Sequence, residues 1–283
     1  MMKESTFQGR KIVIATKHEK EKAIAPILQQ TFDLEVIVPP DFDTDQLGTF
    51  SGETDRVEDP LSTARKKCLM AMELSSCDLA ISNEGSFGPH PSIPFAYADD
   101  EIMFLLDKKN ELEIFVRVLT TETNFNARSI ETKEELKAFA QMAKFPSHAL
   151  IIKRAKDDFQ DMEKGITDSS RLLALFDRFK KETGAAYIET DMRALYNPTR
   201  MQVIEQATQK LVKKMLSKCP ECFTPGLGIT IVKEGLPCNL CNSPTRSILS
   251  YVYECQKCAY SREELYPNDK KYEDPMYCDF CNP

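Results

Sequence analysis

The sequence predicts an α/β (or α+β) N-terminal domain with a mixed sheet, followed by a small C-terminal zinc-ribbon domain that holds two zinc sites of four cysteines each. Stretches with the pattern of strands and helices alternate over residues 11–216, which is typical of a sheet covered by helices. Eight of the ten cysteines lie after residue 217 in four C-x-x-C pairs. We therefore place the domains at residues 1–217 and 218–283.

Composition and charge narrow the class of protein. The chain is 42 % hydrophobic and 29 % charged, as in an ordinary globular protein, and its net charge is −7. That charge gives no global basic field for nucleic acid or an anionic membrane. No apolar run approaches the roughly 20 residues of a membrane helix, and residues 1–6 lack the apolar core of a signal peptide. We expect a soluble cytoplasmic protein whose cysteines bind metal and do not form disulfides.

The first third of the chain reads as a strand, a helix and a second strand. Residues 11–15 form a short apolar run, and Thr16 is a possible N-cap for a helix that reaches Leu28. Pro26 lies inside that helix, so we expect a kink or a late start. Residues 34–38 read as the second strand.

A helix at residues 60–74 has the clearest start signal in the chain. Asp59 stands at the capping position and Pro60 at the first helical position. Cys68 and Cys77 have no C-x-x-C partner, and we interpret them as structural thiols. Further along we expect strands at 102–106, 112–119, 149–152 and 186–188, and helices at 134–143, 169–181 and 198–216.

The stretch from Asp78 to Asp100 is the centre of our functional interpretation. Leu79–Ile81 reads as a buried strand, and the glycines and prolines that follow predict a loop. Polar loops at the carboxyl ends of strands are where open α/β sheets bind ligands. The polar side chains of this predicted loop are Glu84, Ser86, His90, Ser92, Asp99 and Asp100.

The four C-x-x-C pairs predict two structural zinc ions. Each pair presents two thiolates to one tetrahedral zinc, and two pairs complete a site with four cysteine ligands. The predicted ligands are Cys219, Cys222, Cys238, Cys241, Cys255, Cys258, Cys278 and Cys281. The spacing leaves the pairing open. Either the two middle pairs share one zinc and the two outer pairs the other, or consecutive pairs share each zinc.

Charge argues against nucleic acid as the partner of the cysteine-rich tail. Residues 218–283 hold seven basic and nine acidic side chains, a net charge of −2. Two zinc ions with four thiolates each bring this to −6. Such a surface opposes binding to a phosphate backbone, so we expect a structural module or a contact site for a protein partner.

Several other loops carry side chains suited to phosphate. The loop with Lys17, His18 and Lys20 precedes a predicted helix N-terminus, where free N–H groups favour anions. Residues 48–53 supply Thr49, Ser51 and Glu53. Arg65 lies on the helix at 60–74, and Arg193 and Arg200 flank the start of the last helix. Solvated helix ends, helix capping and surface ion pairs are the alternative roles for these side chains. The P-loop, dinucleotide-binding and H-E-x-x-H motifs are absent from the sequence.

Two resemblances follow from these segments. The whole chain resembles an uncharacterised bacterial family, a domain of unknown function with a cysteine-rich tail. The segments that carry this resemblance are A-T-K-H-E-K-E, L-G-T-F-S-G-E, D-P-L-S-T-A-R-K-K-C, S-N-E-G-S-F-G-P-H-P, E-T-D-M-R-A-L-Y-N-P-T-R-M and G-L-P-C-N-L-C. The first 120 residues also look like the opening of the inosine-triphosphatase-like pyrophosphatases, in Ala15-Thr16, in Gly48–Phe50 with Glu53, and in Ile81–Glu84. The second resemblance implies that the loop beginning at Ala15-Thr16 binds phosphate and that Glu53 holds a metal. His18 stands where that superfamily has asparagine.

These observations predict a metal-assisted phosphohydrolase or nucleotide-binding enzyme with a structural zinc tail. Mg²⁺ would bridge carboxylates and substrate phosphates. Glu84 and Glu53 are the predicted catalytic carboxylates, with Asp99 and Asp45 next. The predicted ligand is a small phosphorylated molecule, with no membrane partner. The alternative is a non-enzymatic zinc-ribbon scaffold that binds a small molecule, a protein or nucleic acid.

Overall fold

A computed structural model describes residues 6–40, 42 and 59–283 of the chain. The chain divides into two compact units, Met1–Val212 and Lys213–Pro283. The boundary between them in the sequence falls inside the last helix, α5 (Pro198–Leu216). The predicted domain boundary lies at residues 217 and 218. Each unit is described by itself below. Within the described ranges, no helix is long and apolar enough to cross a membrane.

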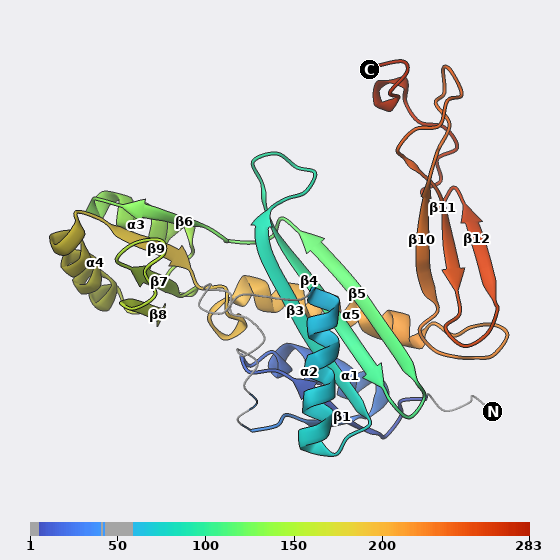
Figure 1. The fold of residues 1–283 in the computed structure, drawn as a ribbon, viewed down its shortest axis with the longest axis horizontal. Helices are drawn as coiled ribbons and strands as arrows, with labels where there is room; N and C mark the ends of the chain where they lie inside the picture. Colours follow the sequence, from blue (N-terminus) through green and yellow to red (C-terminus); the bar gives the residue numbers. More distant parts are fainter. Residues whose placement is uncertain (1–5, 41, 43–58) are drawn as a thin grey trace. The chain divides into compact units, whose positions relative to one another are not determined.

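A five-stranded mixed sheet forms the centre of the first unit (Figure 1). The strand order is β2-β1-β3-β4-β5, with β1 parallel to both β2 and β3 and with β3, β4 and β5 antiparallel to one another. Their bounds are β1 Lys11–Ala15, β2 Glu35–Ile37, β3 Leu79–Pro89, β4 Tyr97–Asp107 and β5 Leu112–Thr120. The predicted mixed sheet is thus confirmed.

Helices flank this sheet because its two faces carry different sets of apolar side chains. Helix α2 (Pro60–Ser75) packs on the face that holds Val13, Ala80 and Phe104, and the Ser82 hydroxyl donates to the carbonyl of Ala64 in this helix at 2.7 Å. Asp59 caps α2 with bonds from Leu61 N and Ser62 N, as the sequence predicts. Helix α1 spans Glu21–Phe32 and contains Pro26. It starts late, at Glu21 with Lys20 as its N-cap, so the expectation that Thr16 caps it is wrong.

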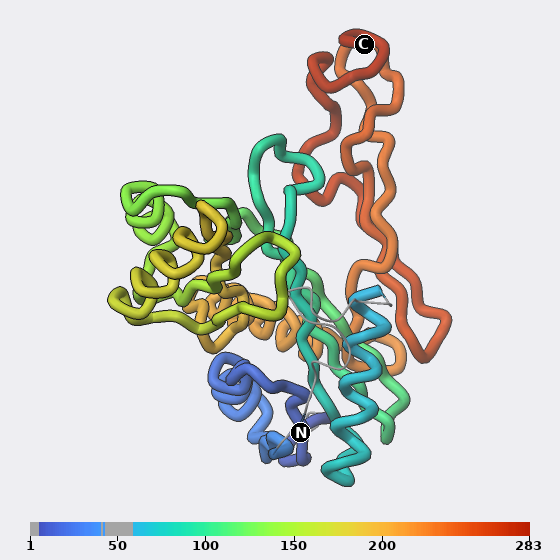
Figure 2. Tube along the Cα trace, turned by 60° about the vertical axis from the view of Figure 1, so that its left-hand side comes forward, coloured from blue at the N-terminus to red at the C-terminus, as the bar shows by residue number. Residues whose placement is uncertain are grey.

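The loop predicted after Ile81 is instead the second half of a long strand. Strand β3 pairs with β4 from Leu79↔Asp107 to Pro89↔Tyr97 without a break. The connection between these strands is confined to residues 90–96 and stands out as a loop (Figure 2). Gly85 fits the strand because a Cβ there would lie 2.5 Å from both Arg200 Nη2 and Glu101 Oε1. This glycine therefore makes room for a neighbouring side chain and does not break the strand.

A second sheet follows in the chain and belongs to the same unit. Its four antiparallel strands have the order β6-β9-β7-β8. A cluster of buried apolar side chains, including Leu136, Phe139, Phe176 and Ile188, joins the sheet to two helices. The elements are β6 Ala127–Ile130, α3 Lys133–Met142, β7 Leu150–Lys153, β8 Met162–Ile166, α4 Ser169–Thr183 and β9 Ala186–Thr190. The predicted helices and two of the strands are confirmed, whereas the sequence pattern does not predict β6 and β8.

The second unit is built on a three-stranded antiparallel sheet in the order β10-β11-β12. These strands are β10 Gly228–Glu234, β11 Ile248–Glu254 and β12 Ser261–Leu265. Apart from cysteines, the buried apolar side chains of residues 213–283 are Met215, Leu236 and Val252. Such a small core is typical of domains that depend on bound metal.

Candidate functional site

The strand order changes direction at β1, and β3 extends past the end of β1. From β1 the chain passes to β2 on one side, and then crosses to β3 on the other side. The pairing of β1 with β3 ends at Ala15↔Ser82, while β3 continues to Pro89. Beyond Ser82, the edge of β3 that faced β1 is therefore no longer paired with it. A crevice at such a switch point is where open α/β sheets bind ligands.

Lys20 lies beside this part of β3. Its Nζ donates to the carbonyl oxygen of Asn83, the first residue of β3 beyond the pairing with β1, at 3.0 Å. The residue is only 7 % exposed. Burial, followed by the positive charge of Arg200, lowers the pKa of Lys20 to about 7, while Glu101 opposes this shift. Lys20 is thus a predicted site residue that the structure places in a buried, charged environment.

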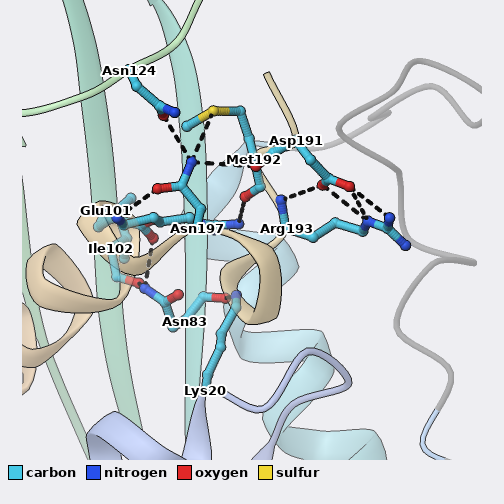
Figure 3. A network of polar contacts seen from close by, with 10 residues as sticks. Lys20, Asn83, Glu101, Ile102, Asn124, Asp191, Met192, Arg193 and Asn197 are labelled. Carbon is cyan, nitrogen blue, oxygen red and sulfur yellow. Dashed lines mark hydrogen bonds and ion pairs between the residues drawn. The ribbon is translucent and has the colours of Figure 1, made fainter. Parts of the chain in front are cut away.

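A buried network joins Asn83, which accepts the hydrogen bond of Lys20, to the start of α5 (Figure 3). Glu101 on β4 accepts a hydrogen bond from Arg200 Nε at 2.7 Å and another from Asn83 Nδ2 at 2.9 Å. Arg200 also donates through Nη1 to the carbonyl of Met192 at 2.6 Å. Burial opposes the ionisation of Glu101, but the charges of Arg200 and Lys20 outweigh it and hold the pKa of Glu101 below its usual value.

Asp99 lies two residues before Glu101 on the same face of β4 and is fully buried. Neither of its carboxylate oxygens receives a hydrogen bond from the residues that the structure describes. Burial and the neighbouring carboxylate of Glu101 raise the pKa of Asp99 to about 8, although Arg200 opposes the shift. Asp99 therefore holds a proton at neutral pH, next to an ionised Glu101.

Glu84 lies on the other face of the sheet, with α2. It is 4 % exposed and forms an ion pair with Lys67 of α2. Glu84 is part of strand β3, where it pairs in register with Ile102. The expectation that Glu84 sits on a loop is wrong, because the strand continues through the two glycines. The charge of Glu84 is neutralised inside the fold.

A hollow opens at the carboxyl ends of β1 and β2. Its volume is about 480 Å³, and it is lined by Thr16, Lys17, Glu19, Glu21, Val38, Pro39 and Phe42. The Thr16 hydroxyl is buried and has no hydrogen-bond partner in the part of the chain that the structure describes. Lys17 is exposed and His18 half-buried in the loop that borders the hollow. The hollow offers a hydroxyl, an ammonium group and an apolar wall to a ligand.

The other predicted site residues are spread over the first unit. Arg65 pairs with Glu113 at 2.8 Å, and Ser86 lies half-buried on β3. His90 Nδ1 accepts from Ser92 N at 3.1 Å within the β3–β4 connection. Arg193 forms an ion pair with buried Asp191 at 2.6 Å and stacks on the ring of Tyr196. Asp45, Thr49, Ser51 and Glu53 lie outside the described residues.

Three partners of the buried charged residues are not identified by the sequence pattern. Asn83 and Glu101 contact Lys20 and Arg200, which lie 63 and 99 residues away in the chain. Lys67 pairs with Glu84 on the other face of the sheet. Asn83 and Glu101 lie within or beside the stretch 78–100. Extending the strand through Gly85 would have set Asn83 and Glu84 on opposite faces, because side chains alternate along a strand.

The eight cysteines of the second unit gather into two groups of four. One group is Cys219, Cys222, Cys255 and Cys258, and the other is Cys238, Cys241, Cys278 and Cys281. Within each group the ligand atoms lie within 4.8 Å of one another. The shortest Sγ–Sγ distances are 3.5–3.8 Å. Four sulfurs around one zinc, with Zn–S about 2.3 Å, stand roughly 3.8 Å apart, whereas a disulfide requires about 2.05 Å. The groups therefore fit two zinc sites of four cysteines each.

Both predicted pairings of the C-x-x-C turns are wrong, because the turns alternate between the two groups. The antiparallel pairing sets Gly228, at the start of β10, beside Glu254, at the end of β11. The turn before β10 and the turn after β11 therefore meet at one end of the sheet. Strand β12 then runs back toward the opposite end, where the fourth turn joins the second.

Local backbone bonds build these turns alike. Cys219 N donates to Thr224 O and Phe223 N to Cys219 O, both at 2.9 Å. The turn at Cys238 repeats both bonds, with Ser243 O and Asn242 N. The side chain of Thr224 and then its backbone lower the pKa of the Cys222 thiol to about 6. A lowered pKa favours the thiolate form that zinc binds.

Comparison with known proteins gives a family and no function. A family model described as a domain of unknown function, DUF6671, matches residues 67–283. A search of curated proteins finds no match. The matched region contains the two cysteine groups together with Lys67, Glu84, Glu101 and Arg200, and it begins after β1 and Lys20. The predicted membership of an uncharacterised family is confirmed, while the resemblance to the inosine-triphosphatase-like pyrophosphatases is not shown and stays a prediction.

Proposed function

This chain belongs to the DUF6671 family, whose description assigns no function, and we propose that its first unit is an enzyme that binds and hydrolyses a small phosphorylated molecule, with nucleotides as the first class to test. The observation that carries the proposal is the buried network of charges around Lys20, whose Nζ donates to the carbonyl of Asn83 just beyond the pairing of β1 with β3. Burying several charges costs stability, so such clusters persist where function requires them and mark candidate active sites.

The hollow at the carboxyl ends of β1 and β2 supports a phosphorylated ligand. Phosphate oxygens would accept from the Thr16 hydroxyl and the Lys17 ammonium group. The loop that carries them leads into α1, whose N-terminus attracts anions. The nearby acidic side chains Glu19 and Glu21 suit hydroxyl groups of the ligand more than its phosphate. A phosphate near Lys20 would also stabilise the ammonium form of that side chain.

The described residues do not form a dedicated Mg²⁺ site. Glu84 is neutralised by Lys67 and Glu101 by Arg200. In the described part of the chain, the groups of three or more possible ligands are the two cysteine groups. Mg²⁺ commonly keeps several waters and binds through one or two carboxylates plus substrate phosphates. The proposal therefore treats Mg²⁺ as an addition to be tested together with the substrate.

The experiment is a hydrolysis screen of nucleoside mono-, di- and triphosphates, with and without Mg²⁺ or Mn²⁺, on the zinc-loaded full chain. We expect Lys17→Ala to raise KM or Kd for the hydrolysed compound about tenfold. Lys22→Ala is the matched control, because Lys22 is exposed on the same segment and pairs with Glu19. Equal effects of the two variants would contradict the placement of phosphate at Lys17. Glu84→Gln is not a clean probe, since it leaves Lys67 buried without its counter-ion.

A non-enzymatic binding protein is the second candidate function, and the second unit favours it. Large apolar side chains are well exposed there, at Phe223, Leu240, Met276, Tyr277 and Phe280. Apolar side chains that form a contiguous patch are typical of protein-contact surfaces, and four of these five lie within or next to the turns of one cysteine group, Cys238–Cys241 and Cys278–Cys281. If the wild-type chain hydrolyses no compound in the screen, this binding role replaces the enzymatic one.

A further inference from the structure

The four C-x-x-C turns differ in the side chain at their third position. In the group that contains Cys219, the third residues are charged, Glu221 and Lys257, and both are exposed. In the other group they are apolar, Leu240 and Phe280, and these residues are 72 % and 74 % exposed. The third position of the turn therefore faces solvent in both groups, but its chemistry differs between them.

The shape of the turn does not account for this difference, because the two groups share their backbone bonds. The N–H of the third residue donates to the sulfur of the first cysteine at 3.4 Å, both at Leu240 and at Lys257. The N–H that follows the second cysteine donates to the carbonyl of the first at 2.9 Å, both at Phe223 and at Asn282. Charged side chains occupy the same turn, so neither its fold nor metal binding requires leucine or phenylalanine there.

Two further apolar side chains extend this surface. Met276 and Tyr277 stand directly before Cys278 and are 59 % and 61 % exposed. One cysteine group, whose ligand atoms lie within 4.8 Å of one another, holds together the chain segments that carry all four side chains. We call Leu240, Met276, Tyr277 and Phe280 the apolar patch. Methionine and aromatic side chains are enriched in protein interfaces, so the patch has the composition of a contact surface.

The surroundings of the apolar patch are negatively charged. Residues 238–242 and 274–283, which carry it, contain Asp274 and Asp279 but no lysine, arginine or histidine. A zinc ion with four thiolates adds a charge of −2. Arg246 pairs with Asp279 at 3.1 Å, but both side chains are exposed, so the pair is weak and a cation of a partner can replace it.

This charge selects among the possible partners. It repels nucleic acid and anionic lipid, and it repels a second copy of the chain, whose net charge is −7. We propose that the apolar patch docks a basic amphipathic helix of a partner protein, whose apolar side chains cover Leu240 and Phe280 and whose cations face the acidic surroundings. This partner class deepens the binding role given above as the second candidate function, on which it rests, and it does not depend on hydrolysis by the first unit.

The first test is a titration of the zinc-loaded full chain into a fluorescein-labelled helical peptide of leucine and lysine, followed by fluorescence anisotropy. The leucines of the peptide stand at helical spacing, on one face. One control peptide has the same composition in scrambled order, and the other has glutamate in place of lysine. We expect saturable binding of the first peptide alone, weakened by salt. No saturable binding of this peptide, or equal binding of the glutamate peptide, would overturn the proposal.

The matched variant exchanges the chemistry of the two cysteine groups. Leu240→Glu with Phe280→Lys introduces the residues that the other group carries at the same position, and it leaves the net charge unchanged. We expect the peptide to bind at least about tenfold more weakly, as for the loss of central interface side chains, while elemental analysis finds zinc as in the wild type. Glu221→Gln with Lys257→Gln is the control and should bind as the wild type does. Wild-type affinity in the first variant would contradict docking at the patch.

A tryptophan reporter locates the bound peptide. The chain contains no tryptophan, so Phe280→Trp places a single indole in the apolar patch. We expect its emission to shift to shorter wavelength when the peptide binds, and an unchanged spectrum at saturation would place the peptide elsewhere and overturn the proposal. Binding of single-stranded RNA, or self-association in sedimentation velocity, that the Leu240→Glu and Phe280→Lys variant abolishes would keep the binding role and replace the basic helix as its partner.

Discussion

The two units of this protein differ in what holds them together. The first unit buries long apolar side chains from two sheets and their helices, and it adds buried ion pairs such as Glu101–Arg200. The second unit buries three apolar side chains besides its cysteines, and its exposed strand β10 adds little to a core. The comparison indicates that the first unit folds through its core, while the second depends on metal.

Removal of zinc should produce the largest difference in stability between the two units. We expect two zinc ions per chain, and we expect a chelator to unfold residues 213–283 while the first unit stays folded, because metal binding and folding are coupled in small zinc domains with cysteine ligands. Elemental analysis counts the zinc, and hydrogen-exchange mass spectrometry reports the protection of each unit. One zinc or none, or unchanged protection of β10–β12 after chelation, would contradict the comparison.

Loss of the Arg200 charge should act on the first unit alone. Arg200→Met leaves Glu101 buried without its counter-ion, and we expect the first unit to lose about 3–5 kcal/mol of unfolding free energy. Arg117→Met is the control. Arg117 is 60 % exposed and pairs with Asp100, which lies next to Glu101 on β4, so this variant should lose less than about 1 kcal/mol of unfolding free energy. Urea unfolding followed by circular dichroism measures both. Equal losses would show that burial of the pair does not matter.

The pH dependence of stability should report the buried Asp99. The folded chain keeps the Asp99 proton up to a pKa of about 8, whereas the unfolded chain releases it near pH 4. The unfolded state therefore binds fewer protons between these values, so stability falls as pH rises, by at most about 1.4 kcal/mol per pH unit. We expect Asp99→Asn to flatten this fall. Asp100→Asn, the neighbour on the opposite face, should change the slope less, because the charge of Asp100 raises the pKa of Asp99 less than burial and Glu101 do.

A smaller effect should follow from the cap of α3. The Thr132 hydroxyl accepts from Glu135 N at 3.1 Å, and the Glu135 carboxylate accepts from Thr132 N, which completes a capping box. Thr132→Ala should lower the unfolding free energy of the first unit by about 1 kcal/mol, and Thr132→Ser should restore most of it. Thermal unfolding by calorimetry compares the three chains. A loss in the second unit would contradict its independence from the first.

The zinc sites show which features the sequence makes predictable. Their ligands could be predicted because a C-x-x-C turn is local and its backbone bonds, such as Phe223 N to Cys219 O, join residues close in the chain. The pairing of the turns could not be predicted without β10 and β12, which carry weak patterns on exposed strands. Once the antiparallel order is known, the alternation follows directly.

The buried network around Lys20 could not be predicted in this way. Lys20 and Arg200 could be singled out as chemical groups, but their partners Asn83 and Glu101 are 63 and 99 residues away. The stretch at 78–100 has the pattern of a loop because glycines such as Gly85 break strands on average. Here the missing Cβ admits Arg200 and Glu101, a tertiary reason that composition does not carry. Most other strands and helices of the unit follow from periodicity and capping, but β6, β8 and the N-cap of α1 do not.

The alternation of the cysteine turns also decides what a truncated chain can bind. The first group needs the chain up to Cys258, and the second needs it up to Cys281. A chain that ends between these two residues can therefore close one zinc site around β10 and β11, while Cys238 and Cys241 lack their partner turn. A premature stop anywhere between residues 259 and 277 would release a chain with one complete site and one exposed, unmatched pair of thiols.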